Sequence, residues 1–186
     1  MPKTRGLVFE TERLIVRAAA EDDIDLYYAL WTNPEVMKHV GFPKGIPLNL
    51  DEMKERPFQR GETEFDQMLV VALQETGQGI GECKLSRPDD EGVAEPDIKL
   101  LPTFWGKGYG YECWMGIVSY LFENTDCDVI QTTPNVANLP AIKIYETTGA
   151  VRAGEDVHHF PESMQAYTIP VHYYIYRLHR DDWLKT

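Results

Sequence analysis

The sequence predicts a mixed α/β domain in which helices flank a mostly antiparallel sheet. Apolar residues recur at helical spacing across residues 114–122, which indicates an amphipathic helix. Residues 68–101 instead hold short apolar runs separated by polar turns, a pattern typical of an antiparallel meander. No repeat, low-complexity tract or linker composition divides the 186 residues, so we expect one domain spanning residues 1–186.

The front of the chain is expected to form one strand and then helices. Leu14 and Val16 alternate with Arg13, Ile15 and Arg17, so one face is more apolar than the other, which favours a strand. Acidic residues precede the apolar positions of the next segment, as at a helix N-terminus, and Asn33 with Pro34 is typical of a capped helix start. The expected elements are a strand at 12–18, a helix within 18–33, a short helix from Asn33 to Val40, and a helix from Asp51 that packs over the first one.

The middle of the chain is expected to be a three-stranded meander. Residues 75–79 read Glu-Thr-Gly-Gln-Gly, a hairpin loop, and residues 86–92 provide a second turn. The strands that these turns separate are 68–73, 80–85 and 93–101.

The rest of the chain returns to helix and strand in alternation. After Gly110 the apolar stripe predicts the best-defined helix, and Asn138 and Gly149 are suited to begin and end another. Strands are expected over 128–133, near Val151 and over 171–178.

Composition excludes several classes of function. The formal net charge of -12 argues against nucleic-acid binding, because a phosphate backbone requires clustered Lys and Arg. No apolar run approaches the length of a membrane span and no signal-peptide core is present, so we expect a cytoplasmic protein with no membrane partner. The acidic charge would attract a cationic partner, although acidic surfaces also serve solubility alone.

Cysteine and histidine residues give no metal or disulfide pattern. Cys83, Cys113 and Cys127 are odd in number and widely spaced, which favours buried thiols. His158 and His159 are adjacent, so their side chains would point apart in an extended chain. We therefore expect no metal site.

The segment with the clearest chemical meaning is a glycine-rich turn, Trp105-Gly106-Lys107-Gly108-Tyr109-Gly110, between an apolar strand and the strongest helix. Backbone N–H groups of such a turn can point at one anion, and the helix dipole favours phosphate there. The G-x-G-x-G spacing matches neither the dinucleotide fingerprint nor the P-loop. Without further context, a plain tight turn is the alternative interpretation.

Four stretches together resemble the GNAT N-acetyltransferase superfamily, specifically the branch of the ribosomal-protein alanine N-acetyltransferases. They read TERLIVRAAAEDD, NPEVMKHVG, IKLLPTFWGKGYGYE and NLPAIKIYETTGA, and they cover nearly the whole chain. Trp105 stands where the superfamily usually has Arg or Gln, a replacement familiar in that branch. Ala150 stands where Phe is expected, which would loosen side-chain contacts behind the site.

The resemblance implies an acetyl-coenzyme A-dependent enzyme with a splayed sheet and a V-shaped slot. Main-chain groups of Ile98, Lys99 and Leu100 would hold the pantetheine arm, and the turn would hold the pyrophosphate. Asn138 would reach the pantetheine arm and Lys143 a coenzyme phosphate, although a helical lysine is also an ordinary solvated charge. The coenzyme-binding residues implied are Ile98, Lys99, Leu100, Trp105, Gly106, Lys107, Gly108, Tyr109, Gly110, Asn138 and Lys143.

Two catalytic residues are implied or inferred. Tyr145 matches the family tyrosine that protonates the departing thiolate, with a core tyrosine as the alternative. Glu82 is the first candidate for the base that accepts the amine proton, because strand alternation places it with Lys84 on one face beside the slot. An exposed strand glutamate is the alternative explanation, and Asp97 and Glu95 are further candidates for the base.

The acceptor is expected to be a primary amine, cationic in solution, such as a protein N-terminus or a small-molecule amine. A non-catalytic acyl-coenzyme A sensor and a plain interaction domain are the competing hypotheses. Tyr173, Tyr174 and Tyr176 are interpreted as strand packing or as an interface, which leaves a homodimer open.

Overall fold

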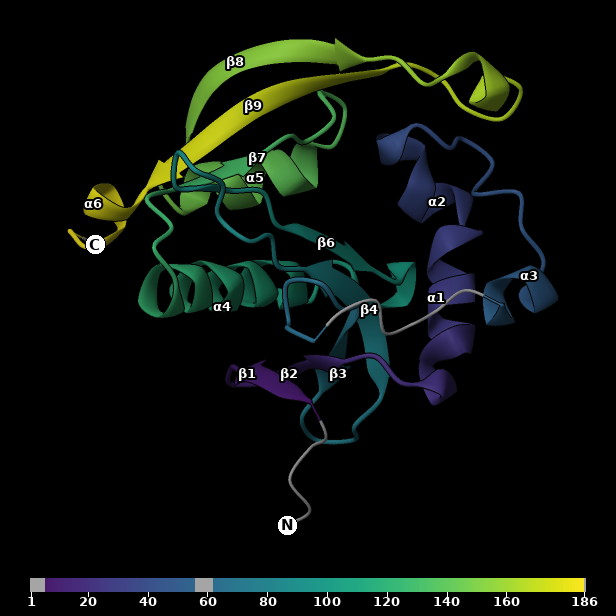
Figure 1. The fold of residues 1–186 in the computed structure, drawn as a ribbon, viewed down its shortest axis with the longest axis horizontal. Helices are drawn as coiled ribbons and strands as arrows, with labels where there is room; N and C mark the ends of the chain where they lie inside the picture. The colour runs from purple at the N-terminus through teal and green to yellow at the C-terminus, as the bar shows by residue number, and fades with distance from the viewer. Residues whose placement is uncertain (1–5, 56–61, 186) are drawn as a thin grey trace.

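The structure, a computed structural model, describes residues 6–55 and 62–185 and contains two sheets (Figure 1). The first sheet is antiparallel, with the strand order β1-β2-β3-β4-β6, and the second has the order β5-β7-β9-β8. Among the strands of the described residues, only β5 and β7 pair in parallel, which confirms a mixed and mostly antiparallel arrangement. The strands are β1 (Leu7–Glu10), β2 (Leu14–Ala18), β3 (Leu69–Leu73), β4 (Gly79–Lys84), β5 (Val93–Ala94), β6 (Asp97–Leu100), β7 (Val129–Thr132), β8 (Val151–His158) and β9 (Val171–His179).

Helices cover both faces of the first sheet, with α4 on one side and α1 on the other (Figure 1). The α-helices are α1 (Ile24–Trp31), α2 (Pro34–Met37), α3 (Leu50–Lys54), α4 (Tyr109–Asn124), α5 (Leu139–Thr147) and α6 (Arg180–Trp183). Short 3₁₀ turns are η1 (Glu21–Asp23), η2 (Lys38–Val40), η3 (Pro102–Phe104) and η4 (Glu162–Met164). Every helix expected from the sequence is present within a few residues of its predicted bounds.

Strand β3 is buried on both faces, which explains its continuous apolar sequence. Leu69 and Val71 belong to the core beneath α4, whereas Val70 and Ala72 pack with Tyr27 of α1. The alternation of strand side chains therefore divides one apolar run between two cores. Met53 of α3 joins the core around Tyr27, which confirms that this helix packs over α1.

The predicted third strand of the meander is interrupted, and this corrects the expectation of one strand over 93–101. Val93 and Ala94 pair with β7 in the second sheet, whereas residues from Asp97 onward pair with β4 in the first. Pro96 lies at the break, where it has no N–H to donate to a ladder. Strand β1 was not predicted, and it adds an antiparallel edge to β2.

The two sheets diverge between β6 and β7, which creates the V-shaped opening expected of the fold. Strand β6 ends the first sheet, and no ladder joins it to β7. Helix α5 follows β7 and lies near α4, beneath the long β8–β9 hairpin in the view of Figure 1. The backbone edge of β6 on this side is therefore left for a ligand.

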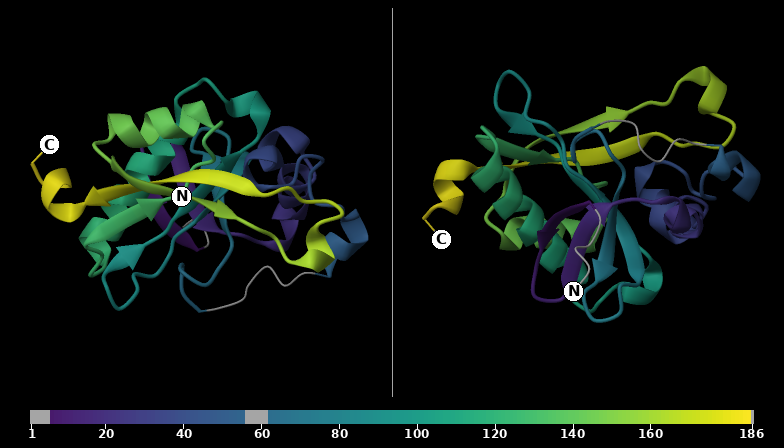
Figure 2. Two further views of the ribbon diagram at one scale, coloured as in Figure 1. Left: turned by 90° about the horizontal axis from the view of Figure 1, so that it is seen from above. Right: turned by 60° about the horizontal axis from the view of Figure 1, so that its bottom comes forward.

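The β8–β9 hairpin extends beyond the second sheet toward α2 (Figures 1 and 2). Phe42, in the loop after η2, has its ring centroid 5.4 Å from that of Phe160 and 6.2 Å from that of Tyr167. Ile169 N also donates to the carbonyl of Gly41 at 2.9 Å. The tip of the hairpin is thus anchored beside the elements that form one wall of the slot.

Candidate active site

A slot of about 630 Å³ opens between β6, the glycine-rich turn and α5, with α2 and η2 at one wall. It brings together ten residues that the sequence singled out. These are Ile98, Lys99, Leu100, Trp105, Gly106, Gly108, Gly110, Asn138, Lys143 and Tyr145.

Strand β6 presents free backbone groups to the slot at alternate residues. Leu101 N donates to Ile80 O at 2.9 Å, so Leu101 is a hydrogen-bonded position of the β4–β6 ladder. Such positions alternate along an antiparallel strand, so the N–H and C=O of Lys99 face β4, whereas those of Ile98 and Leu100 face away from it. The indole N–H of Trp105 donates to Leu100 O at 2.8 Å. The expected main-chain contacts to a ligand therefore narrow to Ile98 and the N–H of Leu100, and Lys99 contributes its side chain instead.

The glycine-rich turn has the geometry of an anion cradle. Gly106 and Gly108 have φ values of +72° and +82°, in the left-handed region, and Gly108 is the N-cap of α4. A Cβ built on Gly106 would meet no atom within 4 Å, so this glycine borders open space. Together these features place a left-handed glycine turn beside open space at the positive end of α4, the type of position that suits an anion.

Gly110, Lys107 and Tyr109 differ from what was expected of the turn. Gly110 is helical, and its Cβ would lie 3.3 Å from Ile144 Cδ1, so this glycine permits close contact between α4 and α5 rather than a left-handed turn. Lys107 and Tyr109 are not among the residues that line the slot. The Lys107 ammonium lies 5.3 Å from the ring centroid of Phe104, and the Tyr109 ring lies under Arg13.

Helix α5 supplies the opposite wall. Asn138 caps this helix by accepting a hydrogen bond from Ala141 N at 3.4 Å, and its side chain also borders the slot. Lys143 is exposed at the mouth of the slot. These positions agree with a polar contact inside the slot and a cation at its entrance.

Tyr145 lies on α5 with its ring packed among aromatic side chains and its edge at the slot. Its ring centroid is 4.8 Å from that of Trp114 and 6.5 Å from that of Tyr176. In the part of the chain that the structure describes, its hydroxyl has no hydrogen-bond partner. Burial and then the negative charge of Asp97 raise the pKa of Tyr145, so the hydroxyl keeps its proton at neutral pH.

Glu82 is a largely buried member of an ionic cluster, so its interpretation as an exposed strand glutamate is wrong. Its carboxylate accepts a hydrogen bond from Trp31 Nε1 at 3.0 Å and lies 3.4 Å from Lys99 Nζ, which also pairs with Asp97. Burial raises the pKa of Glu82, against the opposing effects of Lys99 and Trp31. Glu82 does not itself line the slot, whereas Lys99, with which it pairs, does.

The other two candidate bases differ in their surroundings. Burial alone would raise the pKa of Asp97, but the Lys99 ammonium more than offsets this and the pKa lies below its usual range. Glu95 is exposed and accepts a hydrogen bond from Gln131 of β7. Only Asp97 therefore shares a cluster with Glu82.

Sequence reasoning missed four residues at the site. Trp31 is the donor to Glu82, and Trp114 is the aromatic partner of Tyr145. Glu35 and His39, from α2 and η2, line the slot opposite β6. Burial and then Lys38 lower the pKa of His39, so this imidazole is more readily neutral than an exposed one.

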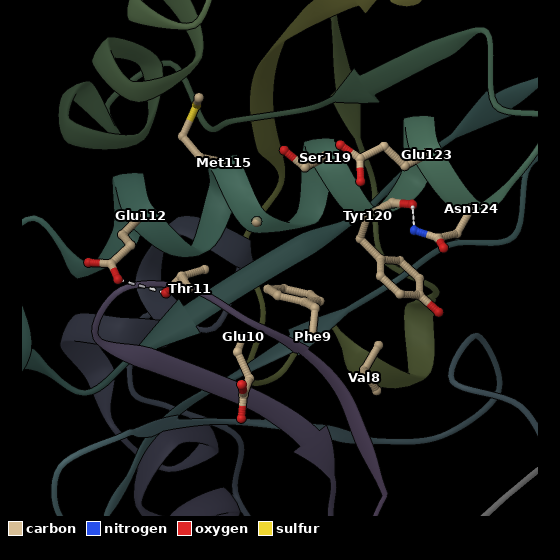
Figure 3. A pocket seen from close by; sticks show the side chains of 11 residues that line it. Val8, Phe9, Glu10, Thr11, Glu112, Met115, Ser119, Tyr120, Glu123 and Asn124 are labelled. Carbon is tan, nitrogen blue, oxygen red and sulfur yellow. Dashed lines mark hydrogen bonds between the residues drawn. The ribbon is translucent and has the colours of Figure 1, made fainter.

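A second hollow lies between β1 and the outer face of α4 (Figure 3). Its rim carries Glu10, Glu112 and Glu123, but the Glu112 carboxylate is occupied by Thr11 and Arg13. None of the residues predicted from the sequence lies there. The chemistry is therefore concentrated in the slot.

Residues 6–55 and 62–185 contain no group of three or more His, Cys, Asp and Glu side chains placed to hold a metal ion. None of their helices has the length and apolar composition that crossing a membrane requires.

Comparison with known proteins gives the same fold and family. The model of the acetyltransferase (GNAT) domain matches residues 13–151. A protein described as an uncharacterized N-acetyltransferase p20 from Bacillus licheniformis is 25% identical over 150 residues, which cover 77% of this chain and 82% of that protein.

Solved structures with this fold include an acetyltransferase of the GNAT family from Bacillus anthracis, with a TM-score of 0.74, 19% identity, and coverage of 92% of this chain and 98% of that one. Another is the aminoglycoside acetyltransferase AAC(6')-Ib in complex with coenzyme A, with a TM-score of 0.70, 20% identity, and coverage of 93% and 98%. A third is a spermidine N-acetyltransferase chimera from Vibrio cholerae, with a TM-score of 0.72, 21% identity, and coverage of 93% and 99%.

The matched family model spans about three quarters of the chain, and the match includes β6, the glycine-rich turn, α4 and α5. The chain therefore belongs to the GNAT acetyltransferase family and is an acetyl-coenzyme A-dependent acyltransferase.

Proposed function

We propose that residues 1–186 form one N-acetyltransferase domain that transfers an acetyl group to a primary amine. The observation that carries this proposal is the convergence of three features in one slot: a free edge of β6, a left-handed glycine turn at the start of α4, and Tyr145. When bound, acetyl-coenzyme A supplies an activated thioester carbonyl. The chain's own residues orient it and manage two protons.

Different residues of the slot are suited to bind different parts of the coenzyme. Backbone groups of Ile98 and Leu100 are placed to hydrogen-bond amides of the pantetheine arm, as an added strand would. Gly106 and Gly108 suit the pyrophosphate, because their N–H groups lie at a positive helix end. Asn138 and Lys143 suit the arm and an outer phosphate.

The two proton transfers of the reaction are assigned to Tyr145 as the general acid and to Glu82 as the general base. A neutral phenol can donate to the sulfur as it departs, and a carboxylate can accept the proton that the attacking amine loses. The raised pKa of Glu82 supports this role, because a more basic carboxylate takes a proton more readily. Glu82 does not line the slot but pairs with Lys99, which does, so the proton would reach it indirectly.

The acceptor is proposed to be a cationic amine. The chain has a net charge of -12, and Glu35 lies on the wall opposite β6. The fold neighbours that act on aminoglycosides or spermidine use acceptors of this charge. The sequence pattern favours the branch that acetylates ribosomal-protein N-termini, and a cytoplasmic location would suit that acceptor.

A panel of acceptors tests the proposed function directly. Release of free thiol from acetyl-coenzyme A would be followed with a peptide amine, a polyamine, an amino sugar and an amino acid, and products would be identified by mass spectrometry. Turnover with at least one amine is expected. Tight binding of coenzyme A without turnover of any amine would instead favour an acyl-coenzyme A sensor, and absence of binding would favour a plain interaction domain.

Salt should weaken the reaction with a multiply charged amine. For the best polycationic acceptor we expect kcat/KM to fall severalfold as the ionic strength rises past about 0.15 M, because salt screens attraction to the acidic protein. A singly charged amine with the same reacting group is the control and should respond less. Equal salt responses of the two amines would contradict electrostatic steering.

Replacing Glu82 by glutamine should slow acetyl transfer about a hundredfold, the usual contribution of general base catalysis. Glutamine keeps the size of the side chain and an oxygen for Trp31 Nε1, but it accepts no proton. In the wild-type enzyme kcat/KM should rise with pH as Glu82 ionises above its raised pKa, and Glu82→Gln should lose this ionisation from the profile.

The matched control is Asp97→Asn, which changes the other carboxylate that pairs with Lys99. If Glu82 is the general base, Asp97→Asn should keep most of the wild-type rate of single-turnover acetyl transfer. A larger loss with Asp97→Asn than with Glu82→Gln would transfer the role of base to Asp97.

A further inference from the structure

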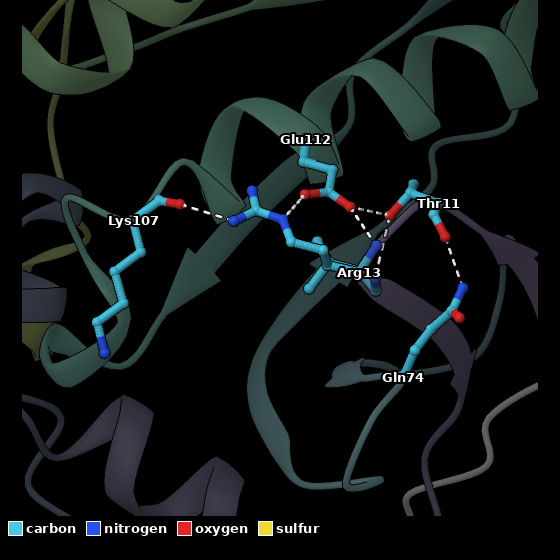
Figure 4. Close-up of polar contacts among 6 residues, drawn as sticks. Thr11, Arg13, Gln74, Lys107 and Glu112 are labelled. Carbon is cyan, nitrogen blue, oxygen red and sulfur yellow. Dashed lines mark hydrogen bonds and ion pairs between the residues drawn. The ribbon is translucent and has the colours of Figure 1, made fainter.

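The side chain of Arg13 connects the start of β2 with the glycine-rich turn (Figure 4). Its Nη1 donates to the carbonyl of Lys107 at 3.1 Å, and its Nε donates to Glu112 Oε2 at 2.6 Å. The guanidinium also lies over the ring of Tyr109, 4.6 Å from the centroid. One side chain thus holds three successive parts of the segment that runs from the turn into α4.

The carboxylate that holds Arg13 is itself fixed. Glu112 lies in the first turn of α4, where a negative charge is favoured by the helix dipole. Thr11 Oγ1 donates to Glu112 Oε1 at 2.6 Å, and the backbone N–H of Arg13 donates to the same oxygen at 2.7 Å. The Glu112 carboxylate therefore accepts from Thr11 and twice from Arg13, and both contacts with Arg13 remain when the Thr11 hydroxyl is removed.

The contact with the Lys107 carbonyl determines where the N–H of Gly108 points. A trans peptide is planar, so its C=O and N–H point in opposite directions. Arg13 is not among the residues that line the slot, whereas Gly108 is. Because Arg13 holds the carbonyl on its own side, the N–H of Gly108 points away from Arg13, and Gly108 is a residue that borders the slot.

The left-handed conformation of the turn adds to the need for such a contact. Gly106 and Gly108, on either side of Lys107, both have positive φ, and glycine has many alternative conformations. The Lys107–Gly108 peptide would otherwise be free to rotate. The Arg13 guanidinium is charged and planar, and its N–H groups point in fixed directions. Its hydrogen bond to the Lys107 carbonyl therefore limits rotation of this peptide.

We propose that Arg13 is a positioning residue that holds the Lys107–Gly108 peptide in the orientation needed to bind the coenzyme pyrophosphate. Arg13 acts through the backbone of the turn rather than by touching the reacting atoms. This inference rests on the proposed function, since it assigns the turn to the pyrophosphate.

The test compares two thioesters, of which only one carries the nucleotide with its pyrophosphate. S-acetylpantetheine has the thioester and the arm but no nucleotide, whereas acetyl-coenzyme A has all three. Arg13→Ala should raise KM for acetyl-coenzyme A about tenfold, the effect of losing one hydrogen bond that involves a charged group. KM for S-acetylpantetheine and for the amine should stay near the wild-type values.

Thr11→Val is the matched control, because it removes the Thr11–Glu112 hydrogen bond from the same network and leaves the Arg13–Lys107 contact. This variant should lower Tm without changing the ratio of the two thioester KM values. If Arg13→Ala fails to fold, Arg13→Gln is measured instead, because glutamine keeps a donor for Glu112 but is too short for the Lys107 carbonyl.

The outcomes separate this inference from the proposed function. An equal rise of KM for both thioesters, or an equal effect of Thr11→Val and Arg13→Ala on their ratio, would show a purely structural arginine and overturn the inference. A wild-type protein that uses neither thioester would instead overturn the proposed function.

Discussion

Substitution of Gly108 by valine is expected to abolish measurable binding of coenzyme A. Gly108 has φ of +82°, in the left-handed region. This conformation costs an ordinary L-residue about 1–2 kcal/mol, and it costs a β-branched residue such as valine more. The new Cβ would also lie 3.3 Å from Arg13 Nη2. The turn would relax to negative φ, and the N–H groups at the start of α4 would no longer converge on one anion.

Gly77 offers a matched control for this substitution. It has φ of +73° in the β3–β4 hairpin, and a Cβ there would meet no atom within 4 Å. Gly77→Val therefore introduces the same type of backbone strain far from the slot. Calorimetric titration with coenzyme A should show normal affinity for Gly77→Val and none for Gly108→Val, while melting curves establish that both are folded.

A folded Gly108→Val protein that binds coenzyme A as tightly as wild type would falsify the assignment of the turn to the pyrophosphate. If this variant does not fold, Gly106→Ala is the second test. Its Cβ would meet no atom within 4 Å, so the substitution adds the backbone strain of positive φ without a clash. Gly77→Ala adds the same strain outside the slot, so a loss of affinity in Gly106→Ala alone reports on the turn.

Local sequence signals predicted most of the fold. The stripe of Trp114, Ile117 and Val118 predicted α4 because one helix face contacts the core, and these side chains are at most 1% exposed. The hairpin between β3 and β4 followed from its glycines. Such features depend on residues close in sequence, and the structure confirms them.

The errors arose where distant parts of the chain decide the outcome. The break before β6 depends on β5 pairing with β7, a strand more than thirty residues away, although Pro96 gave a local hint. The polar environment of Glu82 likewise depends on α1 and β6, which supply Trp31 and Lys99. Strand alternation gave the face of Glu82 correctly but not its partners.

The same distinction applies to the site. The glycine-rich turn was recognisable because consecutive residues form it, whereas His39 enters the slot only because α2 packs opposite β6. Gly110 is helical rather than part of the turn, because α4 begins at Tyr109, two residues before the start expected after Gly110. A glycine inside a helix indicates a close approach by a neighbour, here Ile144 of α5.

Replacement of Tyr145 by phenylalanine is expected to slow the acetyl-transfer step about a hundredfold or more, the usual contribution of general acid catalysis. The hydroxyl has no hydrogen-bond partner within the described residues, and burial and Asp97 keep it protonated by raising its pKa. Phenylalanine keeps the ring, and with it the contact of 4.8 Å between the centroids of this ring and Trp114. The substitution therefore removes the proton donor and leaves the aromatic packing in place.

Tyr176→Phe is the matched control, because this tyrosine lies near Tyr145 but donates its hydroxyl to Glu146 at 2.6 Å and does not line the slot. Both variants would be compared in single-turnover acetyl transfer with enzyme in excess, because slow product release can hide a slowed chemical step in kcat. The catalytic role requires a large fall for Tyr145→Phe only, with the affinity for coenzyme A and Tm little changed. An unaltered single-turnover rate in folded Tyr145→Phe would leave Tyr145 as a core tyrosine, and proton delivery to the sulfur would have to come from solvent.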